Sequence, residues 1–164
     1  MQAGASLGTA LTSTAVTLTL YNPVNSGIWC VLLETTLGIT TGLAAAGATA
    51  YVHAVNVNPF AAAPTSVTNA TIRNCLLGGT TGLANAYTAA TLPAAPVVAR
   101  TPFTSRVIGA TPVSEFSVSF IDNTDGKIIL TPNTAVTLQC IGTASSGIVG
   151  FIWEEVPIIP MSTG

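Results

Sequence analysis

The sequence is unusually poor in charged residues. Only 6% of its 164 residues are Asp, Glu, Lys or Arg, against roughly 25% in an average globular domain. A soluble monomer normally covers its surface with such side chains. This chain must cover itself with Thr, Ser, Asn and Ala, or bury part of its surface against other chains. The low charge therefore favours a component of an assembly.

The few charges also argue against two classes of partner. The basic residues are scattered along the chain: Arg73, Arg100, Arg106 and Lys127. They form no cluster that would bind nucleic acid or an anionic membrane surface. The longest uncharged span, 35–72, is broken by Thr, Gly, Asn, His and Pro. It does not supply the roughly 20 apolar residues of a membrane helix. The amino terminus has no basic segment, which predicts no secretory signal.

Cysteine and histidine are scarce as well. Cys30, Cys75 and Cys140 are an odd number at wide spacing, which does not indicate a disulfide framework. We expect buried thiols, in keeping with assembly in a reducing cytoplasm. The one histidine, His53, has no Cys or His at metal-ligand spacing. We therefore expect no metal and no cofactor.

Motifs for catalysis are missing too. The sequence has no G-x-S-x-G elbow and no phosphate-binding loop. Glu154 and Glu155 are adjacent, so on a strand they face opposite ways and cannot converge on a substrate. Asp122 and Asp125 lie in a loop that lacks the ligand number of a calcium site, which favours a plain turn. All the acids lie far from His53 in sequence, and we expect no enzyme.

The chain is organised around the stretch Tyr21–Ile39, YNPVNSGIWCVLLETTLGI. Turn residues open it, and the unbroken apolar run 28–33 follows. The run predicts a strand buried on both faces, because bulky residues are bounded by turn signals. Near the carboxyl end, SSGIVGFIW (145–153) repeats this design, again with a Trp. We interpret both stretches as central strands of one sandwich.

The rest of the chain alternates between short apolar patterns and turns. About ten short strands separated by turn signals are typical of an all-β protein. The sequence predicts a single-domain antiparallel β-sandwich, jelly-roll-like, over 15–164, preceded by a flexible amino-terminal arm, 1–14. Further strands are expected at 15–21, 49–57, 70–77, 97–100, 106–108, 113–121, 128–130, 134–141 and 148–156, with loops at 58–65, 78–96 and 122–127.

The alternation also predicts which side chains are buried and which meet a partner. Residues on the expected inner faces are core candidates: Val16, Leu18, Leu20, Trp29, Val31, Leu33, Phe116, Val118, Phe120, Val136, Leu138, Phe151 and Trp153. Tyr87 lies in the long polar loop, and Phe60 and Phe103 lie beside prolines. These three aromatic residues are candidates for an interface with another subunit; the alternative for each is local loop packing.

Both ends of the chain resemble a known class of proteins. LYNPVNSGIWCVLLETTLGI, together with NTAVTLQCIGTASSGIVGFIWEEVPI near the carboxyl end, is similar to segments of small β-rich virion proteins of tailed bacteriophages. The resemblance covers the two ends of the chain and concerns structural motifs. It implies a capsid decoration (cement) protein, or a head- or tail-fibre module, usually trimeric and jelly-roll-like.

The resemblance therefore implies a structural or binding function, with no catalysed reaction. The first expectation is a structural protein that binds the major capsid protein on the outside of the particle as a homotrimer and stabilises it. Its location would be the virion surface, after assembly in the host cytoplasm. The alternative is a fibre module that binds a host receptor or glycan, which would require aromatic and carboxylate side chains in a concave patch.

Overall fold

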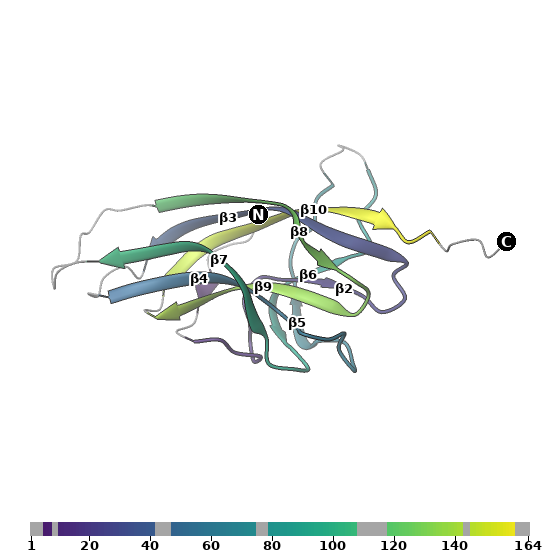
Figure 1. Cartoon of the computed structure of the whole chain (residues 1–164), viewed down its shortest axis with the longest axis horizontal. Helices are drawn as coiled ribbons and strands as arrows, with labels where there is room; N and C mark the ends of the chain where they lie inside the picture. Colours follow the sequence, from purple (N-terminus) through teal and green to yellow (C-terminus); the bar gives the residue numbers. More distant parts are fainter. Residues whose placement is uncertain are drawn as a thin grey trace.

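The computed structural model describes residues 5–7, 10–41, 47–74, 79–107, 118–142 and 145–159. The predicted fold class is confirmed: this part of the chain is all-β and forms two antiparallel sheets. The sheets lie one above the other as the layers of a sandwich (Figure 1). Core side chains of both sheets meet between the layers.

The two sheets are built from strands that are widely separated in sequence. The four-stranded sheet has the order β1-β10-β3-β8, and the six-stranded sheet has the order β5-β6-β2-β9-β4-β7. The strand bounds are β1 (Ala5–Leu7), β2 (Thr19–Asn22), β3 (Ile28–Thr41), β4 (Gly47–Val55), β5 (Thr65–Asn69), β6 (Asn85–Thr91), β7 (Val97–Val107), β8 (Val118–Leu130), β9 (Thr134–Gly142) and β10 (Ser145–Pro157).

Strand β3 is central in its sheet, as predicted, but only one of its faces is buried. Ile28, Cys30 and Leu32 point into the sandwich and are at most 5% exposed. Their neighbours point outward because successive side chains of a strand face opposite ways. Trp29 is therefore 46% exposed, and its assignment to the core is wrong. Val31 and Leu33 are half-buried on the same outer side.

The turn that precedes β3 is held by a buried side chain. Asn22 donates from Nδ2 to the carbonyl oxygens of Ile28 at 2.8 Å and of Leu130 at 2.9 Å. Ser26 donates its hydroxyl proton to Asn22 Oδ1 at 2.6 Å. Gly27 adopts a φ of 70°, which glycine accepts without strain. The Asn-Pro and Asn-Ser-Gly signals thus form a turn that joins β2 to the ends of β3 and β8.

The six-stranded sheet differs because the chain itself covers its outer face. Tyr21 and Ala135 point away from the other sheet, because Leu20 and Val136 beside them belong to the core between the layers. They pack with residues from β6 and from the loops in a second apolar cluster: Val16, Phe60, Tyr87, Ala90 and Leu92. This cluster covers Ala135 of β9, a strand that is buried on both of its faces over residues 135–140.

The interface candidates lie in the interior instead. Phe60 and Tyr87 are 5% and 7% exposed within that outer cluster, so their prediction as interface side chains is wrong. Phe103 is 7% exposed and lies in β7, where its ring centroid is 4.8 Å from that of Phe120. All three aromatic residues pack on parts of this chain, which leaves them no surface for a partner.

Most other core candidates occupy interior positions. Val16, Leu18, Leu20, Val136 and Leu138 are at most 5% exposed. Phe120, Phe151 and Trp153 are half-buried and pack against the clusters between the sheets. Val118 begins β8, and Phe116 lies outside the described residues.

Several strand boundaries differ from the prediction. The loop predicted at 78–96 contains β6, and β7 is one continuous strand instead of two. The strand predicted at 70–77 is wrong for 70–74, which are irregular, and 75–77 lie outside the described residues. The hairpin predicted at 122–127 is a bulge within β8. Glu34 of β3 pairs with Asn123 and Leu32 with Ile128, so extra residues of β8 lie opposite Leu33.

Described residues of the predicted arm contact both sheets. Strand β1 pairs with β10. Thr12 and Gln139 exchange hydrogen bonds of 2.9 and 3.0 Å. Leu92 donates its backbone N–H to the carbonyl oxygen of Ser13 at 2.7 Å. Thr12 and Ser13 therefore help to cover the outer face of the six-stranded sheet.

Candidate functional site

The most polar part of the interior is a cluster between the two sheets. His53 of β4 lies 2.9 Å from Thr35 of β3 through Nε2 and Oγ1. Its Nδ1 lies 3.9 Å from Asp122 Oδ2 of β8. Arg100 of β7 donates to Asp122 Oδ1 at 2.6 Å. The fold thus brings an acid to the histidine, although the two are far apart in sequence.

The order hydroxyl, imidazole and carboxylate is the order found in nucleophilic catalysis. Thr35 and His53 are fully buried, however, so a substrate cannot reach the hydroxyl oxygen. Burial lowers the pKa of His53 to about 4, against the attraction of Asp122, and the positive charge of Arg100 acts in the same direction as burial. The imidazole is neutral at pH 7. The cluster therefore links four strands from both layers.

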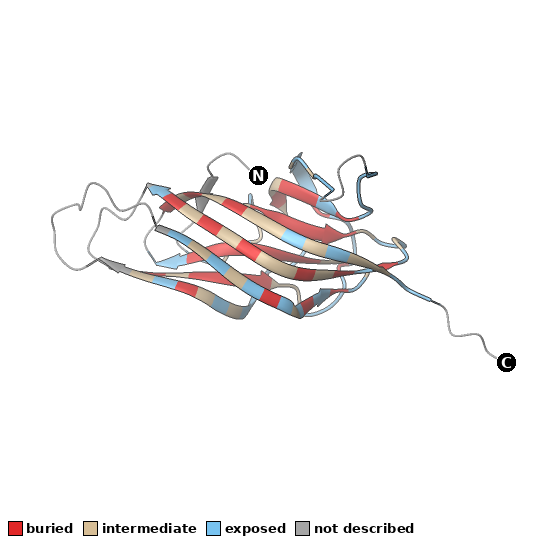
Figure 2. Ribbon diagram, turned by 90° about the horizontal axis from the view of Figure 1, so that it is seen from above, coloured by how far each residue is buried: buried red, intermediate tan, exposed pale blue. Residues whose placement is uncertain are grey.

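The outer face of the four-stranded sheet has a different character, since it carries exposed apolar side chains that no described segment covers. It carries exposed side chains from all three of its long strands: Trp29 (46%), Ile121 (67%), Ile129 (53%) and Ile152 (43%). The strand register places half-buried aliphatic residues among them, Val31, Ile148 and Val156, and half-buried Leu33 follows the inward-facing Leu32. We call these eight residues the outer apolar face. Figure 2 looks onto this layer and shows exposed and half-buried residues between the buried ones.

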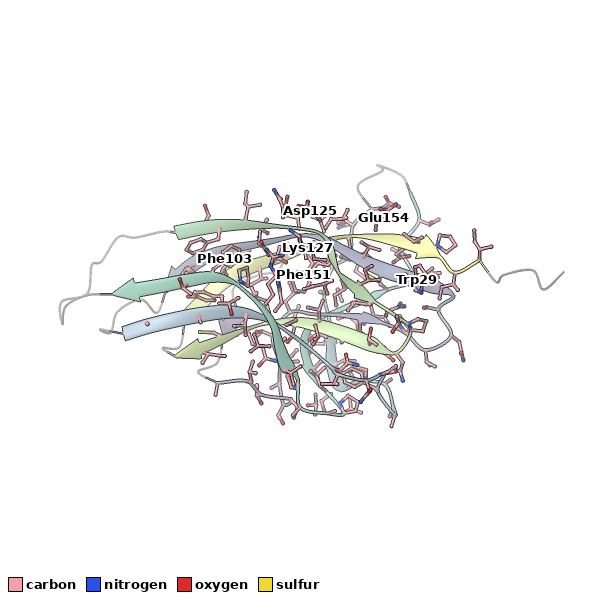
Figure 3. All side chains as sticks on the ribbon, viewed as in Figure 1. Trp29, Phe103, Asp125, Lys127, Phe151 and Glu154 are labelled. Atoms are coloured by element: carbon pink, nitrogen blue, oxygen red, sulfur yellow. The ribbon has the colours of Figure 1, made fainter. Side chains whose placement is uncertain are left out.

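Several charged side chains share this face. Glu154 pairs with Val31 in register, and Glu34 lies between Ile152 and Asn123. Asp125 and Gly126 have φ values of 50° and 73° in the β8 bulge, and Gly126 lies against Val31. Asp125 and Glu154 project away from the six-stranded sheet (Figure 3). Three carboxylates and the ammonium of Lys127 therefore adjoin the apolar side chains.

No family model, no curated protein and no solved structure matches the chain.

Glu155 faces the opposite way from Glu154, as the strand alternation predicts. Its carboxylate accepts backbone hydrogen bonds from Leu83 at 2.8 Å and from Ala84 at 2.9 Å, and the Trp153 indole donates to it at 3.3 Å. A side chain at Gly82 would collide with this carboxylate. Glu155 therefore fastens the segment before β6 to β10.

A groove lies beside this attachment. It holds about 260 Å³ and is lined by Ile72, Arg73, Asn74, Gly82, Phe151, Ile152, Trp153 and Glu155. The lining of this groove thus combines aromatic rings with an arginine and a carboxylate. A second hollow of about 210 Å³ shares Arg73, Phe151 and Trp153 with it. These side chains come from β10 and from the segment between β5 and β6.

The described residues contain no group of three or more His, Cys, Asp or Glu side chains suited to a metal ion. Asp122 turns inward to Arg100, whereas Asp125 is exposed.

Cys30 and Cys140 are buried. Burial raises the pKa of Cys30 to about 12, and the negative charge of Glu155 makes a smaller contribution in the same direction. Cys75 lies outside the described residues. No helix of the described part is long and apolar enough to span a membrane.

Proposed function

We propose that the chain is a structural virion protein that binds the outside of a phage capsid and stabilises it. The observation that carries this proposal is the outer apolar face. Apolar patches of this kind on a soluble protein mark interaction surfaces. Loops cover the outer face of the six-stranded sheet, whereas no described segment covers the outer face of the four-stranded sheet.

The resemblance of the chain ends supports the same surface. Both segments that resemble phage virion proteins contribute to it: Trp29 comes from the first, and Ile152 and Val156 come from the second. They meet because β3 and β10 are paired along their length. Docking this face on the capsid would add buried area between capsid subunits, and a protein that binds only the assembled shell stabilises that shell.

We also propose that the protein acts as a homotrimer. Three linked subunits bind a lattice far more tightly than one, because the second and third contacts form within the same complex. Light scattering of the purified protein measures this directly, and a trimer mass is expected. A monomer mass would restrict trimer formation to the capsid surface.

The test uses capsids of the encoding phage prepared without this protein. Wild-type protein should sediment with them and raise the temperature at which they release DNA. Ile129→Ser should weaken this binding while the protein stays folded, because its side chain is 53% exposed. Val57→Ser is the matched control, since Val57 is 73% exposed on the other layer. Folded wild-type protein that does not sediment with the capsids would refute the proposal.

The groove beside Glu155 favours a second candidate, a fibre module that binds a glycan. Phe151 and Trp153 offer ring faces, and Arg73 offers hydrogen-bond donors. Titration of a panel of neutral and acidic oligosaccharides, followed by tryptophan fluorescence, would test this function. Saturable binding that Arg73→Ala removes would favour it over capsid docking.

A further inference from the structure

The middle of the outer apolar face contains a carboxylate that this chain does not neutralise. Glu34 is half-buried, with Ile152 of β10 on one side and Asn123 of β8 on the other. Among the described residues the ion pair at neutral pH is that of Asp122 with Arg100. Glu34 thus lies between an apolar and an amide side chain and has no cationic partner in the described chain.

The charges around Glu34 add to this imbalance. Glu154 lies on the same face beside Val31, and Asp125 is exposed on the β8 bulge. Lys127 is the cation that the described strands place here, and Arg73 lies at the β10 edge in the groove that Ile152 also lines. The side chains on the strands themselves, Glu34, Asp125, Lys127 and Glu154, carry a net charge of −2.

A wholly apolar partner would fit this face poorly. Covering the isoleucines would also remove water from Glu34, and burial of a carboxylate without a counter-charge is strongly unfavourable. A second copy of this chain would fit poorly too, because it would bring the same excess of carboxylates. A partner that supplies cations among apolar side chains removes the penalty.

We propose that the surface covering the outer apolar face presents an arginine to Glu34, within an apolar patch whose margin is basic. Arginine suits this position because its planar guanidinium pairs with a carboxylate through two hydrogen bonds and is weakly hydrated. A second basic side chain would meet Glu154. The inference rests on the proposed docking of this face on the capsid and specifies the chemistry of the partner.

The experiment compares variants in sedimentation with the same capsids at low and high salt. Glu34→Gln keeps the size of the side chain and removes its charge. It should weaken binding by about 30-fold or more, the usual loss for one partner of a buried, hydrogen-bonded charge pair. The salt dependence of binding should also become flatter. Asn58→Asp, a single charge change at an exposed residue of the loop between β4 and β5, is the control and should bind as wild type.

The possible outcomes separate this inference from the proposed function. If Ile129→Ser loses binding but Glu34→Gln binds as tightly as wild type or more tightly, the face docks on the capsid and the arginine pairing is wrong. If wild-type protein does not bind, the proposed function fails and the inference fails with it. If wild-type protein forms a dimer that Ile129→Ser dissociates, the occupant is a second copy and the inference is overturned.

Discussion

Acidification should destabilise the sandwich through His53. In the folded protein the pKa of this buried imidazole is lowered from 6.5 to about 4. The unfolded chain therefore binds a proton between these pH values that the folded chain does not bind. The stabilising effect is complete above pH 6.5, and it is lost as the pH falls toward 4. The difference of about 2.5 pKa units, at 1.36 kcal/mol each, corresponds to about 3 kcal/mol.

The assay is urea unfolding followed by tryptophan fluorescence from pH 7.5 to pH 4. Carboxylates also titrate near the acid end, so the informative quantity is the difference between wild type and His53→Gln. The variant removes the titration and keeps a side-chain amide that can bond to Thr35. We expect the variant to be less stable than wild type at pH 7, because Asp122, which Arg100 holds, loses the imidazole that lies beside it. Its free energy of unfolding should vary less with pH.

The expected result is a wild-type curve that falls by about 3 kcal/mol more than the variant curve over this range. Parallel curves would show that the imidazole does not change its pKa on folding. In that case the cluster would not be desolvated, and a proton would reach His53 in the folded protein.

Other predictions concern stability at neutral pH and use the same unfolding assay. Trp29→Ala should cost about 1 kcal/mol or less, whereas Leu32→Ala, on the inner side of the same strand, should cost about 2–5 kcal/mol; equal losses would contradict the one-sided burial of β3. Gly82→Ala should cost about 2 kcal/mol, because it displaces Glu155 from two backbone amides, and a neutral result would mean that the carboxylate is not held there. Asn22→Ala should cost about 2 kcal/mol or more, because two buried carbonyl groups lose their donor; unchanged stability would mean that water replaces the amide.

The sequence predicts most accurately those strands in which apolar and polar residues alternate strictly. Val136 and Leu138 in β9 are buried as expected, because a period of two fixes the inner face once a strand forms. The run 28–33 is apolar at every position, which predicts burial on both faces. In the structure, Trp29, Val31 and Leu33 form an outer surface instead. An unbroken apolar run equally suits a strand with one face in the core and one face for a partner.

The errors elsewhere come from contacts that a local pattern does not contain. Tyr87 lies among polar and small residues, and its burial depends on Tyr21, Phe60 and Ala135 from distant segments. Asp-Gly at 125–126 is a strong hairpin signal. The chain continues in β8 after it because Ile128 and Leu130 still pair with β3. The approach of Asp122 to His53 likewise depends on how the layers stack.

The pairing of β10 with β1 and β3 has a consequence during biosynthesis. The four-stranded sheet joins β1 and β3 to residues 145–157, so it cannot close until the ribosome has made residues more than 100 positions after β3. At about 5–20 residues per second, β3 waits several seconds for its neighbour. During that time its apolar run has no strand on the β10 side. A chaperone that shields residues 28–33 should therefore raise the yield of native protein, and nascent chains that stop before residue 145 should be removed by proteases.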